Sequence, residues 1–335
     1  MVMKMKMKLN LDSLAVILYT SDIIPTNIEP LTNEEWFHVE KHLRGGENHD
    51  PSRLIGMNID TLHQILGIDL DIAKKLIART GLLPDLIHSL HNLDSEHISI
   101  TTKYENDYPQ SLLKLKGRMP LILYYCGDLN LLQHNVVSIV GPQTKDKTLS
   151  KPIRKVVDKI LQEKIPILVQ GIKGTDEYVT QIVLKNNGKL VMMTADHMLD
   201  KMIEYKKQIR NAQMLLISAV DPYAYFNLTN SLDRNIYVCG LSNTQFVIAA
   251  HINSGPVWFT SVQNLHYQWT KPLVLTTDTD YNGNLRLIEM GAIPVSRADL
   301  LSDLSIDEIV MNNEEKKVES ITLIDQMSIY EFLDD

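Results

Sequence analysis

The stretch PILVQGIKGTDEYVTQIVLKNNGKLVMMT, at residues 166–194, carries the clearest pattern of secondary structure in this chain. It begins with a short apolar run, passes a turn with two glycines, and continues with apolar residues at helical spacing over 175–187. It then ends in a second apolar run. A strand, a crossover helix and a second strand form a βαβ unit, whose strands are parallel. The stretch therefore predicts a parallel sheet.

The same alternation continues on both sides of this stretch. Apolar, β-branched runs predict strands at 136–141, 166–171, 189–194, 214–219, 246–250 and 272–277, and helices at 149–164 and 175–187. Runs this apolar are typical of strands that are covered on both faces. We therefore predict an α/β fold: a Rossmann-like, doubly wound, mostly parallel sheet with a small helical domain at the N-terminus.

Changes in pattern along the chain predict three parts. They are a helical N-terminal accessory domain at 1–100, a Rossmann-like domain at 101–302, and an acidic C-terminal tail with a short helix at 303–335. In the first part apolar residues recur at helical spacing. Thr32, followed three residues later by Glu35, matches a capping box at a helix start.

Composition excludes several classes of protein. With 44% hydrophobic and 22% charged residues, the chain is neither collagen-like nor wholly disordered. Its apolar runs are far shorter than the ~20 residues of a membrane span. The first residues do not resemble a secretory signal, so we expect a cytoplasmic protein. Cys126 and Cys239 stand alone without CxxC spacing, so we expect core thiols rather than a disulfide framework or a zinc site.

Charge is distributed unevenly along the chain. The net charge of −8 divides into −5 for residues 1–100, +5 for 101–300 and −8 for 301–335. Local potential governs the capture of a charged ligand more than total charge does. The distribution therefore permits an anionic ligand on the middle segment.

In such a sheet, ligands bind at the carboxyl ends of the strands, where loops carry glycines and helix N-termini present N–H groups. Four segments fit this description: 141–147, 170–177, 233–235 and 252–260. The spacing of Gly171 and Gly174 is not GxGxxG. A dinucleotide cofactor is therefore not expected.

Taken in order, these segments resemble the DNA-processing protein A family (DprA/Smf). SIVGPQ (138–143) stands where the family has a strand ending in Gly-Ser-Arg, and 169–193 stands where it has Ser-Gly-x-Ala-x-Gly-Ile-Asp followed by a helix and a strand. SLDRNIYVCGLS (231–242) is similar to the family's Arg-Asn-Arg segment, and 281–301 to its closing Gly-x-Asn-x-Leu-Ile-x-x-Gly-Ala stretch. The resemblance covers about residues 105–302 and rests on the order of the motifs.

The resemblance implies a Rossmann-like domain that binds single-stranded DNA without catalysis and, in transformable bacteria, helps to load RecA recombinase. Phosphates require N–H donors from glycine turns and helix N-termini, with a few cations. The residues expected to contact DNA or phosphate are Gly141, Gln143, Gly171, Lys173, Gly174, Arg234, Asn235, Ser254 and Gly255. Asp176 is expected to hold the second loop rather than to act as a catalytic group. Neither a cofactor nor a metal is implied; a RecA-type recombinase and a second copy of the chain, in a homodimer, remain open as partners.

The chain departs from the family pattern in its loops. Gly141, Pro142 and Gln143 replace Gly-Ser-Arg, which removes a hydroxyl, a backbone N–H and a positive charge together. Ile236 replaces the second arginine of Arg-Asn-Arg, and Gln170 replaces the leading serine of the second loop. These departures predict few phosphate contacts.

Two other classes share this architecture. Cytokinin-activating phosphoribohydrolases carry Pro-Gly-Gly-x-Gly-Thr-x-x-Glu at about the fourth loop, where this chain has NSGPVWFTS (253–261). Without the paired glycines, the threonine and the glutamate of that motif, a glycosidic-bond hydrolase lacks its acid and its phosphate turn. A nucleotide-sensing or scaffold protein, for example in phage defence, would keep the pocket without the DNA groove. It is the alternative to DNA binding.

Overall fold

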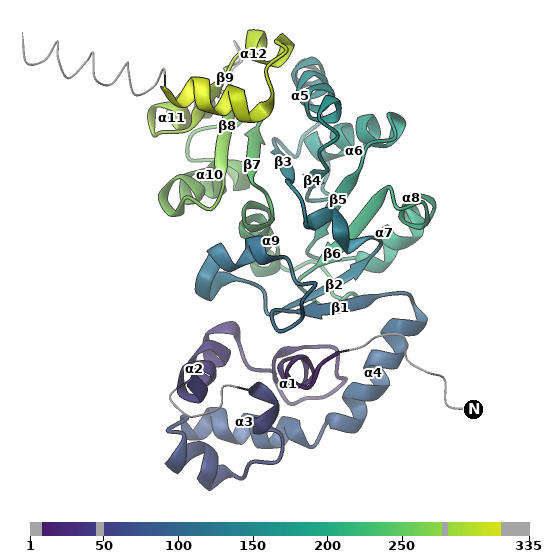
Figure 1. Ribbon diagram of the computed structural model, residues 1–335, viewed down its shortest axis with the longest axis vertical. Coiled ribbons are helices and arrows are strands. Elements are labelled where there is room, and N and C mark those ends of the chain that lie inside the picture. The colour runs from purple at the N-terminus through teal and green to yellow at the C-terminus, as the bar shows by residue number, and fades with distance from the viewer. Residues whose placement is uncertain (1–8, 45–49, 277–280, 316–335) are drawn as a thin grey trace, which may run out of the picture. The chain divides into compact units, whose positions relative to one another are not determined.

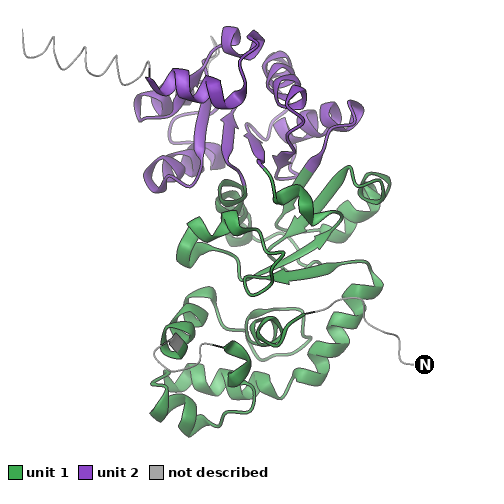
Figure 2. Ribbon diagram, viewed as in Figure 1, with its two compact units in different colours: residues 1–134, 191–241 green, residues 135–190, 242–335 purple. Residues whose placement is uncertain are grey.

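The computed structural model describes residues 9–44, 50–276 and 281–315. The chain divides into two compact units (Figure 2). Unit 1 comprises residues 1–134 and 191–241, and unit 2 comprises residues 135–190 and 242–335. The three parts predicted from the sequence, at 1–100, 101–302 and 303–335, have other boundaries than these units. That division stays a prediction.

Helices make up the N-terminal part of unit 1 (Figure 1). They are α1 (Leu11–Thr20), α2 (Asn33–Arg44), α3 (Leu70–Thr80) and α4 (Leu83–Ser95), with short helical turns η1 (Pro51–Leu54) and η2 (Thr61–Ile65). The predicted capping box is confirmed at the start of α2. The backbone N of Thr32 donates to Glu35 Oε2 at 2.8 Å, and the backbone N of Glu35 donates to Thr32 Oγ1 at 3.1 Å.

A buried arginine joins these helices. Arg79 of α3 is 1% exposed, and its guanidinium donates three hydrogen bonds of 2.7 Å. The acceptors are the backbone carbonyls of Leu18, Ser21 and Ile28. The last carbonyls of a helix have no partner inside the helix. Arg79 therefore caps the C-terminal end of α1 from another helix.

The rest of unit 1 is mixed α and β. Its strands are β1 (Ser99–Thr102), β2 (Ile122–Cys126), β5 (Leu190–Thr194, whose first residue lies in unit 2) and β6 (Met214–Ser218); its helices are α7 (Met198–Glu204), α8 (Lys206–Arg210) and α9 (Leu228–Leu241), with 3₁₀ turns η3 (Gln110–Arg118) and η4 (Leu129–Leu132). β2 pairs antiparallel with both β1 and β6. The sequence predicted β5 and β6 but not β1 and β2, because these two are separate from the βαβ alternation.

Unit 2 carries the parallel strands. They are β3 (Val137–Val140), β4 (Ile167–Val169), β7 (Thr244–Val247), β8 (Lys271–Leu275) and β9 (Ile293–Val295); the helices are α5 (Ser150–Gln162), α6 (Thr175–Lys185), α10 (Gly255–Tyr267), α11 (Asn282–Glu289) and α12 (Arg297–Leu301), with the 3₁₀ turn η5 (Lys147–Leu149). β3 pairs in parallel with β4 and β7, β7 with β8, and β8 with β9. The full order is β1-β2-β6-β5-β4-β3-β7-β8-β9. The predicted Rossmann-like, mostly parallel α/β fold is confirmed.

The lysine of η3 that packs toward α9 gives a pH-dependent prediction. Burial lowers the pKa of Lys114 from 10.5 to about 8. Between these two values the unfolded chain holds a proton that the folded chain has lost, so this group makes the free energy of unfolding rise with pH. We expect Lys114→Met to be more stable than the native chain at neutral pH, and this advantage to shrink as the pH rises to 10.5.

Urea unfolding across that interval measures the effect. The matched control is Lys185→Met, which changes an exposed lysine at the end of α6. A stability difference between Lys114→Met and the native chain that does not change with pH would contradict the buried-lysine assignment.

Candidate nucleic-acid interface

Three of the predicted loops lie at one edge of unit 2. β3 has β4 on one side and β7 on the other, both parallel to it (Figure 1). The chain therefore winds outward from β3 in both directions, and the carboxyl ends of β3 and β7 form a topological switch point. Ligands of open α/β sheets bind outside the strands at such a point. This edge is the candidate site.

The first loop follows β3 and packs closely on α6. Gly141 is buried, and a Cβ there would lie 2.4 Å from Oγ1 of Thr175. Thr175 donates to the carbonyl of Pro142 from its backbone N at 3.0 Å and from its hydroxyl at 3.1 Å. Gln143 is exposed and offers an amide where the family has a positive charge. The start of the helix is thus attached to the end of the strand.

The second loop is shaped by a glycine and a buried carboxylate. Gly174 has φ +81°, and a Cβ there would lie 2.4 Å from the carbonyl O of Pro142, which is backbone and has no rotamer to change. Asp176, 2% exposed, accepts from the backbone N of Gln170 at 2.7 Å and of Ile172 at 3.4 Å. These bonds bear out the expectation that Asp176 holds this loop.

Much of the N–H capacity of the second loop is used internally. Besides the N–H groups of Gln170, Ile172 and Thr175, that of Gly174 donates to the Glu177 carboxylate. Gly171, with φ +72°, and the exposed Lys173 lie between these tied residues. A ligand at this loop would meet Gly171 and Lys173 rather than the whole predicted cradle.

The fourth loop is open to solvent. Ser254 is the N-cap residue of α10, makes no capping bond with its side chain, and is exposed together with Gly255. Gly255 has φ +74°, and a Cβ there would meet nothing within 4 Å. The free N–H groups at the start of a helix attract anions. Of the predicted loops, this one is the most accessible helix N-terminus.

A residue that sequence reasoning missed holds this fourth loop in place. Asn284 of α11 is 3% exposed, and its Oδ1 accepts from the backbone N of Ala250 at 2.8 Å. Its Nδ2 donates to the carbonyls of Ile248 at 3.0 Å and Leu275 at 2.9 Å. The one hint to Asn284 in the sequence was that an asparagine follows a glycine next to apolar residues. Asn284 joins the ends of β7 and β8.

Two charged side chains near the first loop are engaged by neighbouring residues. Lys145 pairs with Glu177 at 2.8 Å, and this hydrogen bond lowers the pKa of Glu177 and raises that of Lys145. Asp146 accepts from Thr148 and, at 2.7 Å, from the hydroxyl of Tyr281; these bonds lower the pKa of Asp146. Lys145 therefore adds little free positive charge to this edge.

Arg234 and Asn235 lie in unit 1, and the predicted loop at 233–235 is wrong. Both residues are inside α9, where Arg234 is 5% and Asn235 3% exposed. The helix begins earlier because the Asn227 side chain accepts from the backbone N of Thr229 at 2.8 Å. Nη2 of Arg234 donates to Ser231 Oγ at 3.0 Å. The structure does not bring these two residues to the surface, so we leave them out of the interface.

Unit 1 carries exposed aromatic side chains in the loop after β6. Tyr225 is 81% and Phe226 66% exposed. The ring of Tyr225 meets that of His197 edge to face, with centroids 5.7 Å apart. Aromatic faces exposed in this way are surfaces on which nucleic-acid bases stack. No motif in the sequence points to these two residues.

Neither a cluster of metal ligands nor a membrane-spanning helix is found among the described residues. Among them, no three or more His, Cys, Asp and Glu side chains come together to hold a metal ion. None of the helices that the structure describes has the length and apolar character to cross a membrane. Cys126 and Cys239 are buried free thiols, as predicted.

Known proteins resemble this chain in sequence and in fold. Among curated proteins, DNA processing protein DprA of Streptococcus pneumoniae (strain ATCC BAA-255 / R6) is 27% identical over 169 residues, which cover 48% of this chain and 52% of that protein. The matched part therefore spans about half the length of that relative. The X-ray structure of DNA processing protein A from Streptococcus pneumoniae has a TM-score of 0.66 and 22% identity, over 90% of this chain and 100% of that one.

A second solved structure shows DNA processing protein A from Helicobacter pylori and concerns its single-stranded DNA binding mode; it has a TM-score of 0.49 and 23% identity over 58% of this chain and 90% of that one. The sequence profile of the family described as DNA recombination-mediator protein A matches residues 99–305. That range includes every loop of the candidate interface. With the profile covering more than half of its length, this chain belongs to the DNA recombination-mediator protein A family.

Proposed function

We propose that this chain binds single-stranded DNA as a non-catalytic recombination mediator. The observation that carries the proposal is the edge of unit 2 at the switch point, where Gly171, Lys173, Ser254 and Gly255 lie on loops at the ends of parallel strands. N–H groups and a lysine at this edge suit a phosphodiester backbone. Membership of the family supports the same ligand.

The residues at this edge also predict how the DNA is held. Gln143 has no charge and Lys145 is paired with Glu177, so few counterions would leave on binding. Independently of that edge, Tyr225 and Phe226 of unit 1 expose ring faces on which bases can stack. We therefore expect binding with a small salt dependence and a preference for single strands, whose bases are free to stack.

The carboxylates of the loops support a role without catalysis. Asp176 is engaged by two backbone N–H groups, and Asp146 by Thr148 and Tyr281. A hydrolase acting on nucleotides would need an acid and a base aimed at the substrate. Both aspartates instead hold their own loops.

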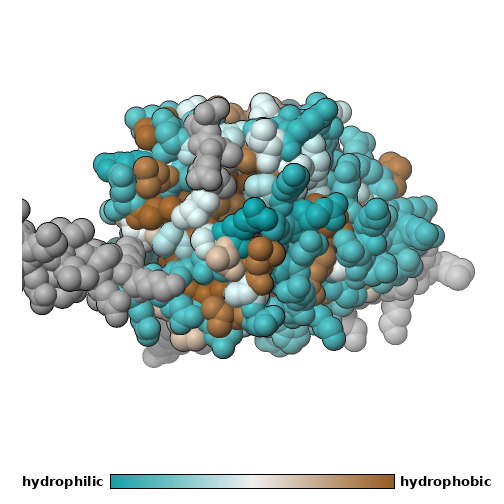
Figure 3. Space-filling model, turned by 90° about the horizontal axis from the view of Figure 1, so that it is seen from above, coloured by the Kyte–Doolittle hydropathy of each residue, from teal (hydrophilic) through white to brown (hydrophobic). Residues whose placement is uncertain are grey.

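Partners other than DNA are part of the same proposal. A RecA-type recombinase is expected because a mediator hands DNA to such a protein. A homodimer is expected because unit 2 exposes the apolar side chains of Leu285, Leu301 and Met311. On the face seen from above, hydrophobic patches lie among hydrophilic side chains (Figure 3). A cytoplasmic location agrees with these partners.

The decisive experiment is a fluorescence-anisotropy titration with a labelled oligo-dT of about 30 nucleotides, its duplex and ATP, at two salt concentrations. The double variant Pro142→Ser with Gln143→Arg adds a hydroxyl, a backbone N–H and a guanidinium at the end of β3. It should bind oligo-dT at least about tenfold more tightly, because a hydrogen bond to a charged group contributes about 1.5–3 kcal/mol. Its salt slope should be steeper.

The matched control is Gln181→Arg, which adds the same charge at an exposed position further along α6. It should leave the affinity close to that of the native chain. If the native chain fails to bind oligo-dT at low salt, the proposal is wrong and the nucleotide-sensing or scaffold alternative stands. Binding of ATP in place of oligo-dT would select nucleotide sensing.

A further inference from the structure

A concave site of unit 1 shares no residue with the loops described above. It has a volume of about 340 Å³ and is lined by Phe37, Glu40, Lys41, Lys103, Leu113, Lys116 and Met119. These residues come from α2, from the chain after β1, and from η3 and the residue that follows it. The volume lies at the lower end of the range of small-ligand sites.

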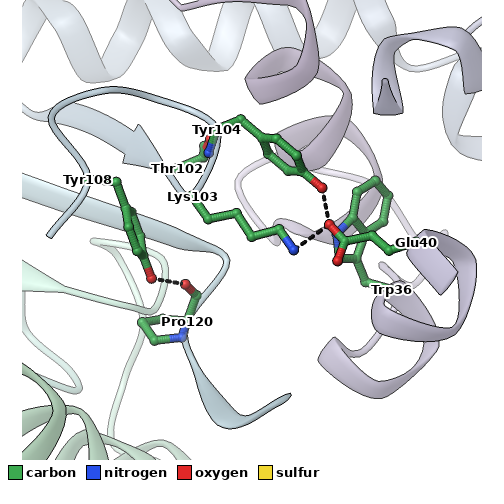
Figure 4. Close-up of polar contacts among 7 residues, drawn as sticks. All are labelled: Trp36, Glu40, Thr102, Lys103, Tyr104, Tyr108 and Pro120. Atoms are coloured by element: carbon green, nitrogen blue, oxygen red, sulfur yellow. Dashed lines mark hydrogen bonds and ion pairs between the residues drawn. The ribbon is translucent and has the colours of Figure 1, made fainter. Parts of the chain in front are cut away.

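The pocket is lined in part by a buried ion pair, which Figure 4 shows with its neighbours. Glu40 and Lys103 pair with only 7% of each side chain exposed. The same carboxylate oxygen accepts from the hydroxyl of Tyr104 and, at 3.2 Å, from the indole N of Trp36. Nζ of Lys103 also lies 4.9 Å from the ring centroid of Phe37. The pair is therefore rigidly held, and the two charges cancel each other.

Two further lysines leave the pocket positive. Lys41 and Lys116 are both exposed. Within residues 9–44, 50–276 and 281–315, neither of them forms an ion pair with a carboxylate. After the Glu40–Lys103 pair is cancelled, the lining carries two positive charges. An anion is the ligand that this charge favours.

The backbone of Lys116 adds an independent sign of a ligand site. Its φ is 54° and its ψ is −126°, a conformation that favours glycine, although Gly117 is the next residue. Strained residues of this kind persist where the surrounding structure holds them, and they cluster at sites that clamp ligands. The residue in this conformation, Lys116, is one of those that line the pocket.

The other walls are apolar. Leu113 is 46% exposed, Met119 is buried, and Phe37 adds an aromatic ring. Cations beside an aromatic and apolar wall match a ligand with a phosphate at one end and a planar base at the other. A bare inorganic anion would leave these walls unused.

We propose that this pocket binds one nucleoside 5′-monophosphate group, with its phosphate at Lys41 and Lys116 and its base against Phe37 and Leu113. The group is either one nucleotide of a DNA strand or a free mononucleotide. The strand as source rests on the proposed function. In that case unit 1 provides a second contact for the DNA, in addition to the edge of unit 2.

The test is calorimetric titration of the full chain with dTMP, thymidine and oligo-dT. The variants are Lys41→Gln and Lys116→Gly, the second of which also relieves the backbone, so its melting temperature should not fall. The charge-matched control is Lys185→Gln on α6, exposed and in unit 2. We expect dTMP to bind more tightly than thymidine, and each pocket variant to weaken dTMP about fivefold while the control does not.

Oligo-dT identifies the source of the nucleotide. If the pocket variants weaken oligo-dT as well, the strand enters the pocket; if they weaken dTMP alone, the ligand is a free mononucleotide. Absence of dTMP binding, with oligo-dT affinity unchanged in both variants, would overturn the pocket and leave the proposed function intact. Binding of hexaglutamate in place of dTMP, lost in both variants, would overturn it in favour of an acidic protein partner. If oligo-dT does not bind while dTMP still binds, only the proposed function is overturned.

Discussion

Replacing Asn284 with alanine is expected to lower the free energy of unfolding by about 3–5 kcal/mol. The amide of Asn284 accepts from the backbone N of Ala250 and donates to the carbonyls of Ile248 and Leu275, at 2.8–3.0 Å. Because Asn284 is 3% exposed, alanine would leave three backbone groups without partners in a place that water does not reach easily. Chemical denaturation measures the loss.

The control for this change lies two residues away. Asn282 accepts from the backbone N of Ile252 at 3.2 Å in an exposed position, so Asn282→Ala should cost about 0.5 kcal/mol or less. Asn284→Ala should also weaken oligo-dT binding in the protein that remains folded, because Asn284 sets the course of the loop that leads to Ser254. Equal stability of the two variants would refute the role of Asn284.

Gly174→Ala should be about as damaging, at about 3–5 kcal/mol, through two effects that add. The residue has φ +81°, which a side chain disfavours. In addition, a Cβ there would lie 2.4 Å from the carbonyl O of Pro142 and 2.5 Å from the carbonyl C of Gln143. Both obstacles are backbone atoms, so the first two loops would have to move apart. Thermal and urea unfolding report the cost.

Gly255→Ala separates the two effects. Gly255 has a similar φ of +74°, but a Cβ there would meet nothing within 4 Å. Only the backbone strain applies, so its cost should be about 1–2 kcal/mol. If Gly174→Ala costs no more than Gly255→Ala, the first two loops are not in the close contact described.

The loops of unit 2 show how far sequence reasoning reached. Apolar runs alternating with helical spacing predicted β3, β4, β7 and β8, and glycines at the strand ends predicted where the loops lie. Both signals are local, because the hydrophobic periodicity of a strand or helix can be recognised within a few residues. The order of the motifs then pointed to the right family before any contact was known. The role of Asp176 could be predicted because its partners lie within six residues of it.

The loop predicted at 233–235 shows where the same reasoning failed. The residue types of Arg234 and Asn235 suggested a phosphate contact on a loop, but a cap at Asn227 starts α9 earlier and takes both residues into the interior. Whether an arginine is exposed depends on what packs over it, and sequence spacing does not report that.

Local patterns along the chain were enough to predict the α/β class, most of the parallel strands, three of the four strand-end loops and the family. Packing was needed to show which N–H groups of those loops are already used, that Asn284 joins two strands, and that Lys41 and Lys116 line one pocket with Phe37. The difference comes from distance along the chain. Periodicity and turn chemistry act between near neighbours. A side chain at position 174, in contrast, is excluded by the carbonyl of Pro142, which is distant in the sequence. The pocket likewise is lined by residues of separate elements that meet only when the chain is packed.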